Sequence, residues 1–239
     1  MKHILSYMRR AIDDYNMIDD GDKIAVALSG GKDSITMLKA LKNLQIFYPK
    51  KFELIAISVN PGFEFFDADF LRKICSELDI PFFEEKYDIS KIIFEDRHEK
   101  NPCSLCANLR RGILNTAAKR EGCNKIALGH NLDDVLETFL MNLFFAGNIS
   151  TFSPVSYMDR SGMTVIRPLI YVPEKDTKRF VKRYGTPIMP KVCPMDGNST
   201  REYIKQLIVT LSLKNKYVKA NIMGAIKRKN LNGWKDTSF

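Results

Sequence analysis

Six consecutive residues, Ser29 to Ser34, have the types and the spacing needed to bind a phosphate group. The two glycines let the backbone approach a phosphate closely, and a helix that begins here would offer unpaired N–H groups and its positive dipole end. Lys32 adds a full positive charge, and the two serines add hydroxyl groups. We therefore predict a phosphate-binding loop made of Ser29, Gly30, Gly31, Lys32, Asp33 and Ser34.

Two widespread phosphate-binding motifs are excluded by single residues of this segment. A Walker loop would need Gly at position 26 and Ser or Thr at position 33, where the chain has Val26 and Asp33. The dinucleotide-binding fingerprint would need a second Gly where Lys32 stands. A plain tight turn, with Asp33 or Ser34 capping the next helix, is the structural alternative. The combination of all six positions favours phosphate binding.

A second group of reactive side chains begins with Cys103 and Cys106, at the start of a predicted helix. Their spacing places both sulfurs on one helix face near the positive dipole end, which favours thiolates, and Arg110 falls on the same face. A metal site needs a third ligand, and Cys193 lies in a loop-like stretch between prolines. Three interpretations stay open: a zinc site with His98 as a further ligand, a redox pair without Cys193, or a 4Fe-4S cluster on three thiolates. The spacing alone favours zinc or redox chemistry.

The segment Gly129 to Asp134 (Gly-His-Asn-Leu-Asp-Asp) follows another short apolar run. Asn131 can cap a helix whose dipole the carboxylates of Asp133 and Asp134 would complement. The same carboxylates could hold Mg²⁺, which takes one or two carboxylates together with phosphates. We expect this loop and the phosphate loop to share one edge of a sheet. We therefore predict that Gly129 and Asn131 contact the nucleotide, and that the two carboxylates contact the metal or the nucleotide.

Predicted strands and helices alternate along the chain, as the spacing of apolar side chains indicates. The strands are predicted over residues 23–28, 52–59, 82–87, 125–128 and 164–166. The helices are predicted over residues 4–18, 34–44, 67–78, 104–119, 133–145 and 174–183. Such alternation implies an α/β fold with a doubly wound parallel sheet. Ligands bind such sheets at the carboxyl ends of strands, so the loops after Leu28, Val59 and Leu128 are expected to form the site.

Composition and charge suggest the compartment and the partners. No apolar run approaches the roughly 18 residues of a membrane span, and the N-terminus lacks a signal-peptide pattern, so we expect a cytoplasmic protein. The net charge is +9, and residues 201–239 carry nine Lys or Arg against two acidic residues. We expect one domain over residues 1–200 and a basic C-terminal tail over 201–239 that either binds a polyanion or stays solvated. The odd count of five cysteines excludes complete disulfide pairing, and Cys75 and Cys123 are interpreted as buried apolar residues.

Four segments together resemble a known family. The loop from Ser29 to Ser34 is similar to the PP-loop of the ATP pyrophosphatase superfamily, whose members split ATP between its α and β phosphates. With the segments 102–114 (PCSLCANLRRGIL), 129–134 (GHNLDD) and 166–169 (IRPL) in this order, residues 1–200 look like the tRNA 2-thiocytidine synthetase family (TtcA). The resemblance implies a PP-loop fold of the adenine nucleotide alpha hydrolase type, with ATP and Mg²⁺. It also implies an adenosine-binding loop after the second strand that includes Ser58, and a 4Fe-4S cluster on the cysteines that match Cys103, Cys106 and Cys193.

The reaction implied by the resemblance is ATP-dependent tRNA thiolation. The O2 atom of a pyrimidine, expected to be the cytidine two places before the anticodon, attacks the α-phosphate, and sulfide carried by the cluster then replaces the adenylated oxygen. Lys32 and Arg110 would stabilise developing charge, with Mg²⁺ near Asp133 or Asp134. The implied partners are tRNA and a sulfur donor, either a cysteine desulfurase or sulfide, and a homodimer is left open. The alternatives are a tRNA 2-thiouridine synthetase, a tRNA lysidine synthetase, which needs no cysteines, and a non-catalytic zinc-stabilised RNA-binding module.

The basic tail is expected to supply affinity for tRNA rather than choice of base. Its lysines would contact phosphates, and its aromatic side chains would stack on unpaired bases. The candidate residues are Lys214, Lys216, Lys219, Lys227, Arg228 and Lys229, with Tyr217 and Trp234 between and after them. Deletion of residues 214–239 is expected to weaken tRNA binding and to leave ATP binding and the cluster in place.

Overall fold

The computed structural model describes residues 1–63, 66–93, 102–190 and 200–236. Two candidate metal ligands, His98 and Cys193, therefore lie outside the described residues. Within these ranges, no helix is both long enough and apolar enough to cross a membrane.

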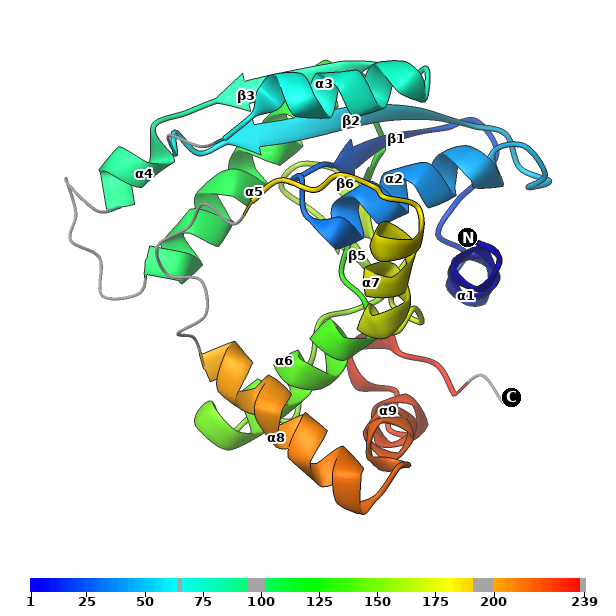
Figure 1. Ribbon diagram of the computed structural model, residues 1–239, viewed down its shortest axis with the longest axis vertical. Helices are drawn as coiled ribbons and strands as arrows, with labels where there is room; N and C mark the ends of the chain where they lie inside the picture. Colours follow the sequence, from blue (N-terminus) through cyan, green and yellow to red (C-terminus); the bar gives the residue numbers. More distant parts are fainter. Residues whose placement is uncertain (64–65, 94–101, 191–199, 237–239) are drawn as a thin grey trace.

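A six-stranded sheet lies at the centre of the described part of the chain (Figure 1). Its strands are β1 Asp22–Ala27, β2 Phe52–Asn60, β3 Phe82–Lys86, β4 Lys125–Ala127, β5 Val155–Met158 and β6 Met163–Ile166. They lie in the order β3-β2-β1-β4-β6-β5, and every neighbouring pair is parallel except β5 with β6. The predicted parallel α/β sheet is confirmed. The sequence prediction missed β5, a four-residue edge strand whose side chains are partly or fully exposed, so it lacks the apolar run of a buried strand.

Helices cover both faces of the sheet, as a doubly wound fold requires. They are α1 Lys2–Asp14, α2 Lys32–Leu44, α3 Ala68–Glu77, α5 Pro102–Arg120, α6 Leu132–Phe145 and α7 Glu174–Arg183, with a short α4 at Ile89–Lys91. Ile24 and Val26 of β1 pack in the larger core with residues of α1, α2 and α6, whereas Ala25 packs in the smaller core with Leu114 of α5. Because β1 is covered on both sides, its sequence is apolar at successive positions rather than alternating.

The first helix ends earlier than predicted. Asn16 has a positive φ of 46°, which stops α1 after Asp14, although Met17 and Ile18 beyond it are fully buried. These two apolar residues continue the helical spacing in the sequence, and the structure uses them as core residues of a connection. The apolar pattern therefore predicted their burial correctly and their conformation incorrectly.

The basic C-terminal segment is helical and folds onto the rest of the chain. It forms α8 Thr200–Lys214, α9 Val218–Arg228 and a short 3-10 turn, Leu231–Gly233. α8 packs against α6 and α9 (Figure 1), with Ile204 and Ile208 buried. The division of the chain at residue 200 stays a prediction, but this segment is not an extended chain.

Trp234 has a structural role in this segment. Its side chain is 0% exposed, and its Nε1 donates a hydrogen bond to the Phe152 carbonyl at 3.0 Å. Its ring lies 5.8 Å from that of Tyr15 and 6.4 Å from that of Tyr171, measured between centroids. The prediction that Trp234 stacks on RNA bases is wrong, because the ring is already packed inside the protein.

Candidate active site

A cavity of about 390 Å³, named here the sheet-end cavity, opens at the carboxyl ends of β1, β2 and β4. The phosphate loop forms one wall, and the loop after β4 and the middle of α5 form others. Outside the phosphate loop, the residues that line the cavity include Ile57, Val59, Arg110, Arg111, Gly129 and His130. The structure thus brings together three segments that are far apart in the sequence, and it places Arg110 where it faces the predicted ATP site.

Gly30 and Gly31 are glycines for different reasons. Gly30 has a φ of +80°, and a Cβ there would lie 2.4 Å from Met189 Sδ. Gly31 has a φ of −76°, and a Cβ there would meet only Ser29 Oγ, at an ordinary 3.6 Å. Neither the backbone conformation nor the packing of the described residues requires glycine at position 31. Its missing side chain instead leaves space in the cavity, as a loop that wraps a phosphate needs.

Hydrogen bonds of the two serines connect the first and last residues of the phosphate loop. Ser34 Oγ donates to the Gly31 carbonyl at 2.9 Å and accepts a hydrogen bond from the Ser29 hydroxyl at 3.2 Å. The Ser29 N–H also donates to Ser34 Oγ, at 3.3 Å. These hydrogen bonds join the two ends of the loop and fix its conformation.

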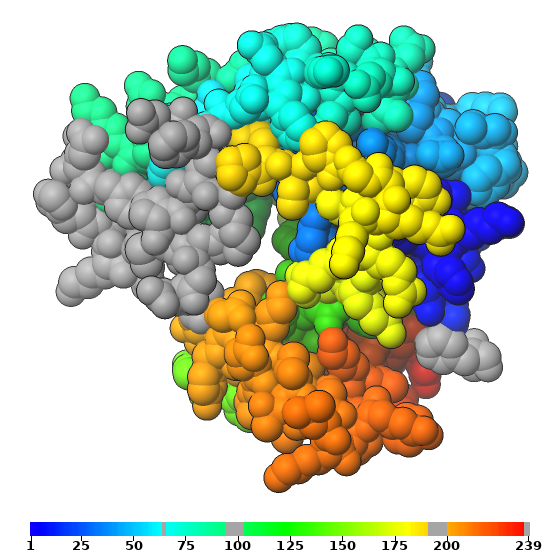
Figure 2. All heavy atoms as spheres, in the orientation of Figure 1, coloured from blue at the N-terminus to red at the C-terminus, as the bar shows by residue number. Residues whose placement is uncertain are grey.

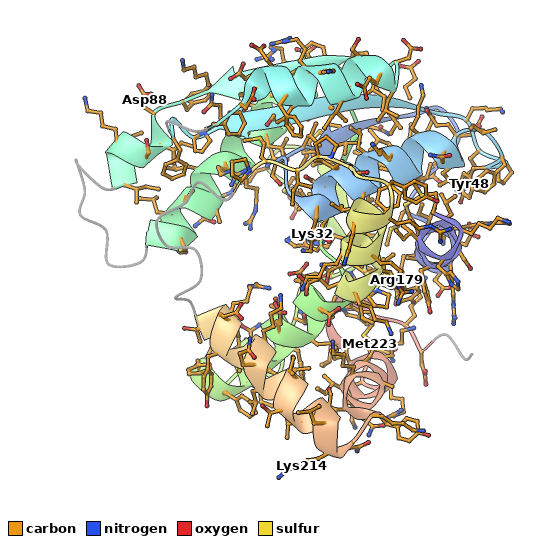
Figure 3. All side chains as sticks on the ribbon, in the orientation of Figure 1. Lys32, Tyr48, Asp88, Arg179, Lys214 and Met223 are labelled. Carbon is orange, nitrogen blue, oxygen red and sulfur yellow. The ribbon has the colours of Figure 1, made fainter. Side chains whose placement is uncertain are left out.

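The first turn of α7 holds Lys32 and Asp33. Lys32 Nζ lies 2.7 Å from Asp33 Oδ2 and 2.9 Å from Glu174 Oε1. Thr177 Oγ1 donates to Asp33 Oδ1 at 2.6 Å. Figure 3 shows Lys32 at the start of α2, beside α7. The loop lysine is thus positioned by a helix more than 140 residues away in the sequence.

Charge pairing at Glu174 sets the protonation of this group. Burial alone would lower the pKa of Lys32, but the carboxylates of Asp33 and Glu174 outweigh burial and raise that pKa above its ordinary value. Burial would raise the pKa of the Glu174 carboxyl, but three ammonium groups outweigh it and lower this pKa to about 2. They belong to Lys205, Lys32 and Lys178. Glu174 therefore stays charged and links the phosphate loop to α8, since Lys205 Nζ lies 2.9 Å from its Oε2.

The acidic motif begins α6 with a capping box. Asn131 Oδ1 accepts the N–H of Asp133 at 2.9 Å and that of Asp134 at 3.2 Å. Asp134 Oδ2 in return accepts the Asn131 N–H at 2.9 Å. The side-chain oxygen of Asn131 is therefore committed to the helix, and the prediction that Asn131 contacts nucleotide rests on its other atoms.

The remaining carboxylate oxygens of the motif bind neighbouring elements. Asp133 accepts a hydrogen bond from the Glu174 N–H at 2.7 Å and another from Lys219 of α9. Asp134 Oδ1 lies 3.3 Å from Arg201 Nη1, and burial raises the pKa of Asp134. Among the described residues, no three acidic, His or Cys side chains are grouped to hold a metal ion. Neither Asp133 nor Asp134 is among the residues that line the sheet-end cavity, and their role in holding Mg²⁺ stays a prediction.

The four described cysteines divide into two kinds. Cys75 and Cys123 are buried, and burial raises the pKa of their thiols to about 12 and about 11. Cys103 is exposed and Cys106 is partly exposed, both in the first turns of α5, just before Arg110. Accessible sulfurs near a helix N-terminus suit thiolate ligation, so this pair fits two of the three positions of a cluster. The third predicted ligand, Cys193, is outside the described residues.

Comparison with known proteins identifies the family. A family model described as a PP-loop domain matches residues 4–211. The chain is 42% identical over 220 residues to the tRNA-cytidine(32) 2-sulfurtransferase of Geotalea uraniireducens (strain Rf4), covering 91% of this chain and 87% of that protein. The protein of the same name from Geobacter sulfurreducens is 40% identical over 228 residues, covering 94% and 89%. The chain belongs to the PP-loop family of tRNA-cytidine(32) 2-sulfurtransferases.

A solved sulfurtransferase structure supports the same family assignment. The U34-tRNA thiolase NcsA from Methanococcus maripaludis, determined with its [4Fe-4S] cluster, superposes with a TM-score of 0.76 at 27% identity, covering 94% of this chain and 77% of that chain. The resemblance stated from the four sequence segments is therefore confirmed. Ser29 to Ser34 lie within the matched PP-loop domain, and their role as its phosphate loop stays a prediction.

The sequence prediction missed two residues of the candidate site in this protein, Glu174 and Arg201. Glu174 opens a predicted helix, and nothing in its spacing connects it to Lys32. Arg201 contacts Asp134, Glu137 Oε2 at 3.2 Å and Thr138 Oγ1 at 3.3 Å, so it joins the start of α8 to α6. Burial, followed by the charge of Asp134, raises the pKa of Glu137 to about 7 against the effect of Arg201. Both residues form long-range pairs that no local pattern reveals.

His130 is a third residue that the sequence prediction left unassigned. It lies in the wall of the sheet-end cavity, and its ring packs on that of Phe152 with centroids 4.8 Å apart. Burial, followed by the charge of Arg167, lowers its pKa to about 3, so the ring is neutral at pH 7. Its buried Nδ1 has no hydrogen-bond partner among the described residues. Its position between Gly129 and Asn131, two predicted nucleotide contacts, could have indicated that His130 lies at the site.

Ser58, the predicted adenosine contact, lies on β2 between two residues of the cavity wall. Ile57 and Val59 line the cavity, whereas Ser58 is fully buried and, by strand alternation, faces the other side of the sheet. Its hydroxyl has no partner among the described residues. The structure therefore brings the neighbours of Ser58, and not its side chain, to the cavity.

Proposed function

We propose that this protein is a cytoplasmic, ATP-dependent tRNA sulfurtransferase that replaces O2 of the cytidine at position 32 with sulfur. The observation that carries the proposal is the composition of the sheet-end cavity. The phosphate loop, the Gly129–His130 loop and α5, with its accessible cysteine pair just before Arg110, meet around one space of about 390 Å³. The names of the relatives, tRNA-cytidine(32) 2-sulfurtransferase, supply the base and its position.

The activation step uses the loop and the carboxylates. ATP binds with its phosphates on Ser29 to Ser34, where Gly31 leaves space and Lys32 supplies charge. Asp133 or Asp134 would hold Mg²⁺, which would neutralise charge on the phosphates. The cytidine O2 attacks the α-phosphorus, an oxygen–phosphorus bond forms, and the bond to the β-phosphate breaks to release pyrophosphate. Arg110 in the cavity wall stabilises negative charge that develops on the phosphate oxygens.

The substitution step then needs sulfide and a leaving group. A 4Fe-4S cluster held by Cys103, Cys106 and Cys193 would supply the sulfide. The sulfur would come either from a cysteine desulfurase or from free sulfide in solution. Sulfur bonds to C2, the bond between C2 and the adenylated oxygen breaks, and AMP leaves with the former O2 atom. Arg110 and Lys32 neutralise the phosphate of the departing AMP. A homodimer is a further expectation, which light scattering of the purified protein measures.

The test follows all products of one reaction. Anaerobically purified protein, ATP, sulfide and unmodified tRNA are expected to yield one AMP and one pyrophosphate for each thiolated cytidine. If the tRNA carries ¹⁸O at O2 of its cytidines, the label is expected in AMP. Thiolated uridine instead of cytidine would support the 2-thiouridine alternative, and a product that requires lysine would support the lysidine alternative. A colourless protein with stoichiometric zinc and no turnover would support the RNA-binding module.

A further inference from the structure

A second and larger cavity, named here the helical cavity, lies between α1, α6, α7, α8 and α9. Its volume is about 890 Å³, which is more than twice that of the sheet-end cavity at about 390 Å³. Figure 2 shows α7 directly above α8 and α9 on this face. Figure 3 places Met223 on the part of α9 near α7, whereas Lys214 is at the far end of α8. No residue of the phosphate loop lines this space.

The charge of the helical cavity is strongly positive. Among the described residues that line it, eight are Lys or Arg and four are Asp or Glu. Three of the acidic groups are already paired: Glu174 with Lys205, Asp133 with Lys219, and Glu137 with an arginine outside the cavity lining. Lys175, Lys216 and Arg228 pair with no carboxylate of the described residues. The excess cations are therefore available to an anionic partner.

The floor of the helical cavity is apolar and aromatic. Leu132, Ile208 and Met223 line it together with the rings of Tyr7 and Tyr171. The Tyr7 side chain is 37% exposed, and Lys227 Nζ lies 4.3 Å from the centre of the Tyr171 ring. An apolar floor with a cationic rim suits a nucleotide, whose base is flat and apolar on both faces and whose phosphate is charged.

Glu174 connects the helical cavity to the phosphate loop, although no described residue lines both cavities. Asp133 and Glu174 line the helical cavity, and Glu174 also contacts Lys32 of the phosphate loop at 2.9 Å. A polymer whose reacting nucleotide lies in the sheet-end cavity can therefore continue directly into the helical cavity. A free nucleotide would not need two adjoining sites, whereas a single-stranded loop of RNA has nucleotides on both sides of the reacting one.

We propose that the helical cavity binds the single-stranded RNA adjoining the modified nucleotide, with phosphates on Lys175, Lys216 and Arg228 and a base on the apolar floor. This inference rests on the proposed function, because it takes tRNA as the substrate. It also separates Lys216 and Arg228 of the basic C-terminal segment, which line the helical cavity and bind RNA, from Lys214, which does not line it and does not bind RNA.

The first experiment measures binding of an anticodon stem-loop RNA to the full-length, anaerobically purified protein at several salt concentrations. The double variant Lys175→Glu/Lys216→Glu is expected to bind at least tenfold more weakly, with the slope of log affinity against log salt reduced by about 0.7 for each lost phosphate contact. The matched double variant Lys73→Glu/Lys119→Glu changes two exposed lysines of α3 and α5 away from the helical cavity. It is expected to bind as the unaltered protein does, and so is Lys214→Glu. ATP affinity and melting temperature serve as folding controls.

The second experiment fills the helical cavity without changing charge. Ala220 of α9 is exposed and lines the cavity, so Ala220→Trp adds an indole there without entering the core. This variant is expected to weaken RNA binding at least fivefold and to leave the salt slope unchanged. The proposal is wrong if the two double variants bind RNA with equal affinity, or if Ala220→Trp binds RNA as tightly as the unaltered protein does. The RNA would then contact another surface. Failure of the unaltered protein to thiolate tRNA would instead contradict the proposed function, so the two failures are distinguishable.

Discussion

The two cavities of this protein are built in opposite ways. The sheet-end cavity is made of loops that directly follow strands, and its key features are backbone features: a glycine with no side chain at position 31 and N–H groups at the start of α2. The helical cavity is made of side chains from α1, α6, α7, α8 and α9, which reach from the N-terminus to the C-terminal segment of the chain. Nucleotide chemistry is therefore encoded in short local segments, whereas the proposed polymer-binding surface depends on tertiary packing. Glu174 connects the two, since it contacts Lys32 and lines the helical cavity.

A change in the phosphate loop at Gly31 is expected to have the largest effect, which is a loss of ATP binding. Gly31→Val places a branched side chain in the space left for a phosphate, so ATP binding is expected to fall below detection by calorimetry. The fold is expected to persist, because φ at this position is −76° and a Cβ meets only Ser29 Oγ at 3.6 Å. Gly112→Val is the matched control, since a Cβ at this position of α5 meets no atom within 4 Å. Unchanged ATP affinity in the first variant would remove the phosphate loop from the mechanism.

Removal of the accessible sulfurs is expected to abolish thiolation while leaving the nucleotide site intact. Cys103→Ala and Cys106→Ala are each expected to lose bound iron and product formation, with ATP affinity unchanged. Cys75→Ala and Cys123→Ala are expected to keep both, because burial makes these thiols poor ligands by raising their pKa to about 12 and about 11. Iron analysis and absorbance near 400 nm measure the outcome. Full iron in either of the first two variants would contradict the cluster assignment.

Unlike the loops of the sheet-end cavity, the C-terminal segment is expected to contribute to the free energy of unfolding, because Trp234 is fully buried. Trp234→Ala is expected to lower the free energy of unfolding by about 3–5 kcal/mol, as for other fully buried large side chains. Deletion of residues 214–239 is accordingly expected to destabilise the whole protein, which revises the sequence-based expectation that ATP binding would persist. Chemical denaturation measures both. A Trp234→Ala variant as stable as the unaltered protein would mean that this segment is a dispensable appendage.

The residue that joins the two cavities is expected to give a smaller effect. Glu174→Gln keeps the shape of the side chain and removes the charge that holds Lys32. We expect kcat to fall by roughly 10- to 100-fold through misplacement of Lys32. ATP binding is expected to be as tight or tighter, because one negative charge beside the phosphate site is gone. A fall in affinity together with unchanged kcat would contradict this positioning role.

The same variant gives the smallest predicted effect, a change with pH. The Glu174 carboxyl has a pKa of about 2 in the folded protein against an ordinary value of 4.5, so its charged form stabilises the fold. This contribution is fully present above pH 4.5 and is lost as the pH falls towards 2. The difference in unfolding free energy between the unaltered protein and Glu174→Gln is expected to close over that range. A difference that stays constant down to pH 2 would show that the charge contributes nothing to stability.

Local features of the chain could be predicted from the sequence, and long-range contacts could not. The alternation of apolar runs predicted the parallel sheet, and the Gly-Gly-Lys segment predicted the phosphate loop, because both are local. The same reasoning missed Glu174 and Arg201, whose partners lie far away in the sequence, and it took Trp234 for an RNA-stacking residue. A lone aromatic residue in a basic segment has the same local pattern whether it faces RNA or the core. Only the packing of Trp234 against Tyr15 and Tyr171 decides between them.

Mass spectrometry of tRNA nucleosides from a strain that lacks this gene tests directly whether this protein thiolates tRNA cytidine. We predict that 2-thiocytidine disappears from tRNA, that the unaltered gene restores it, and that the Gly31→Val and Cys103→Ala variants do not. A level of 2-thiocytidine that stays unchanged in the deletion strain would contradict the assignment of this protein as the enzyme that thiolates tRNA cytidine.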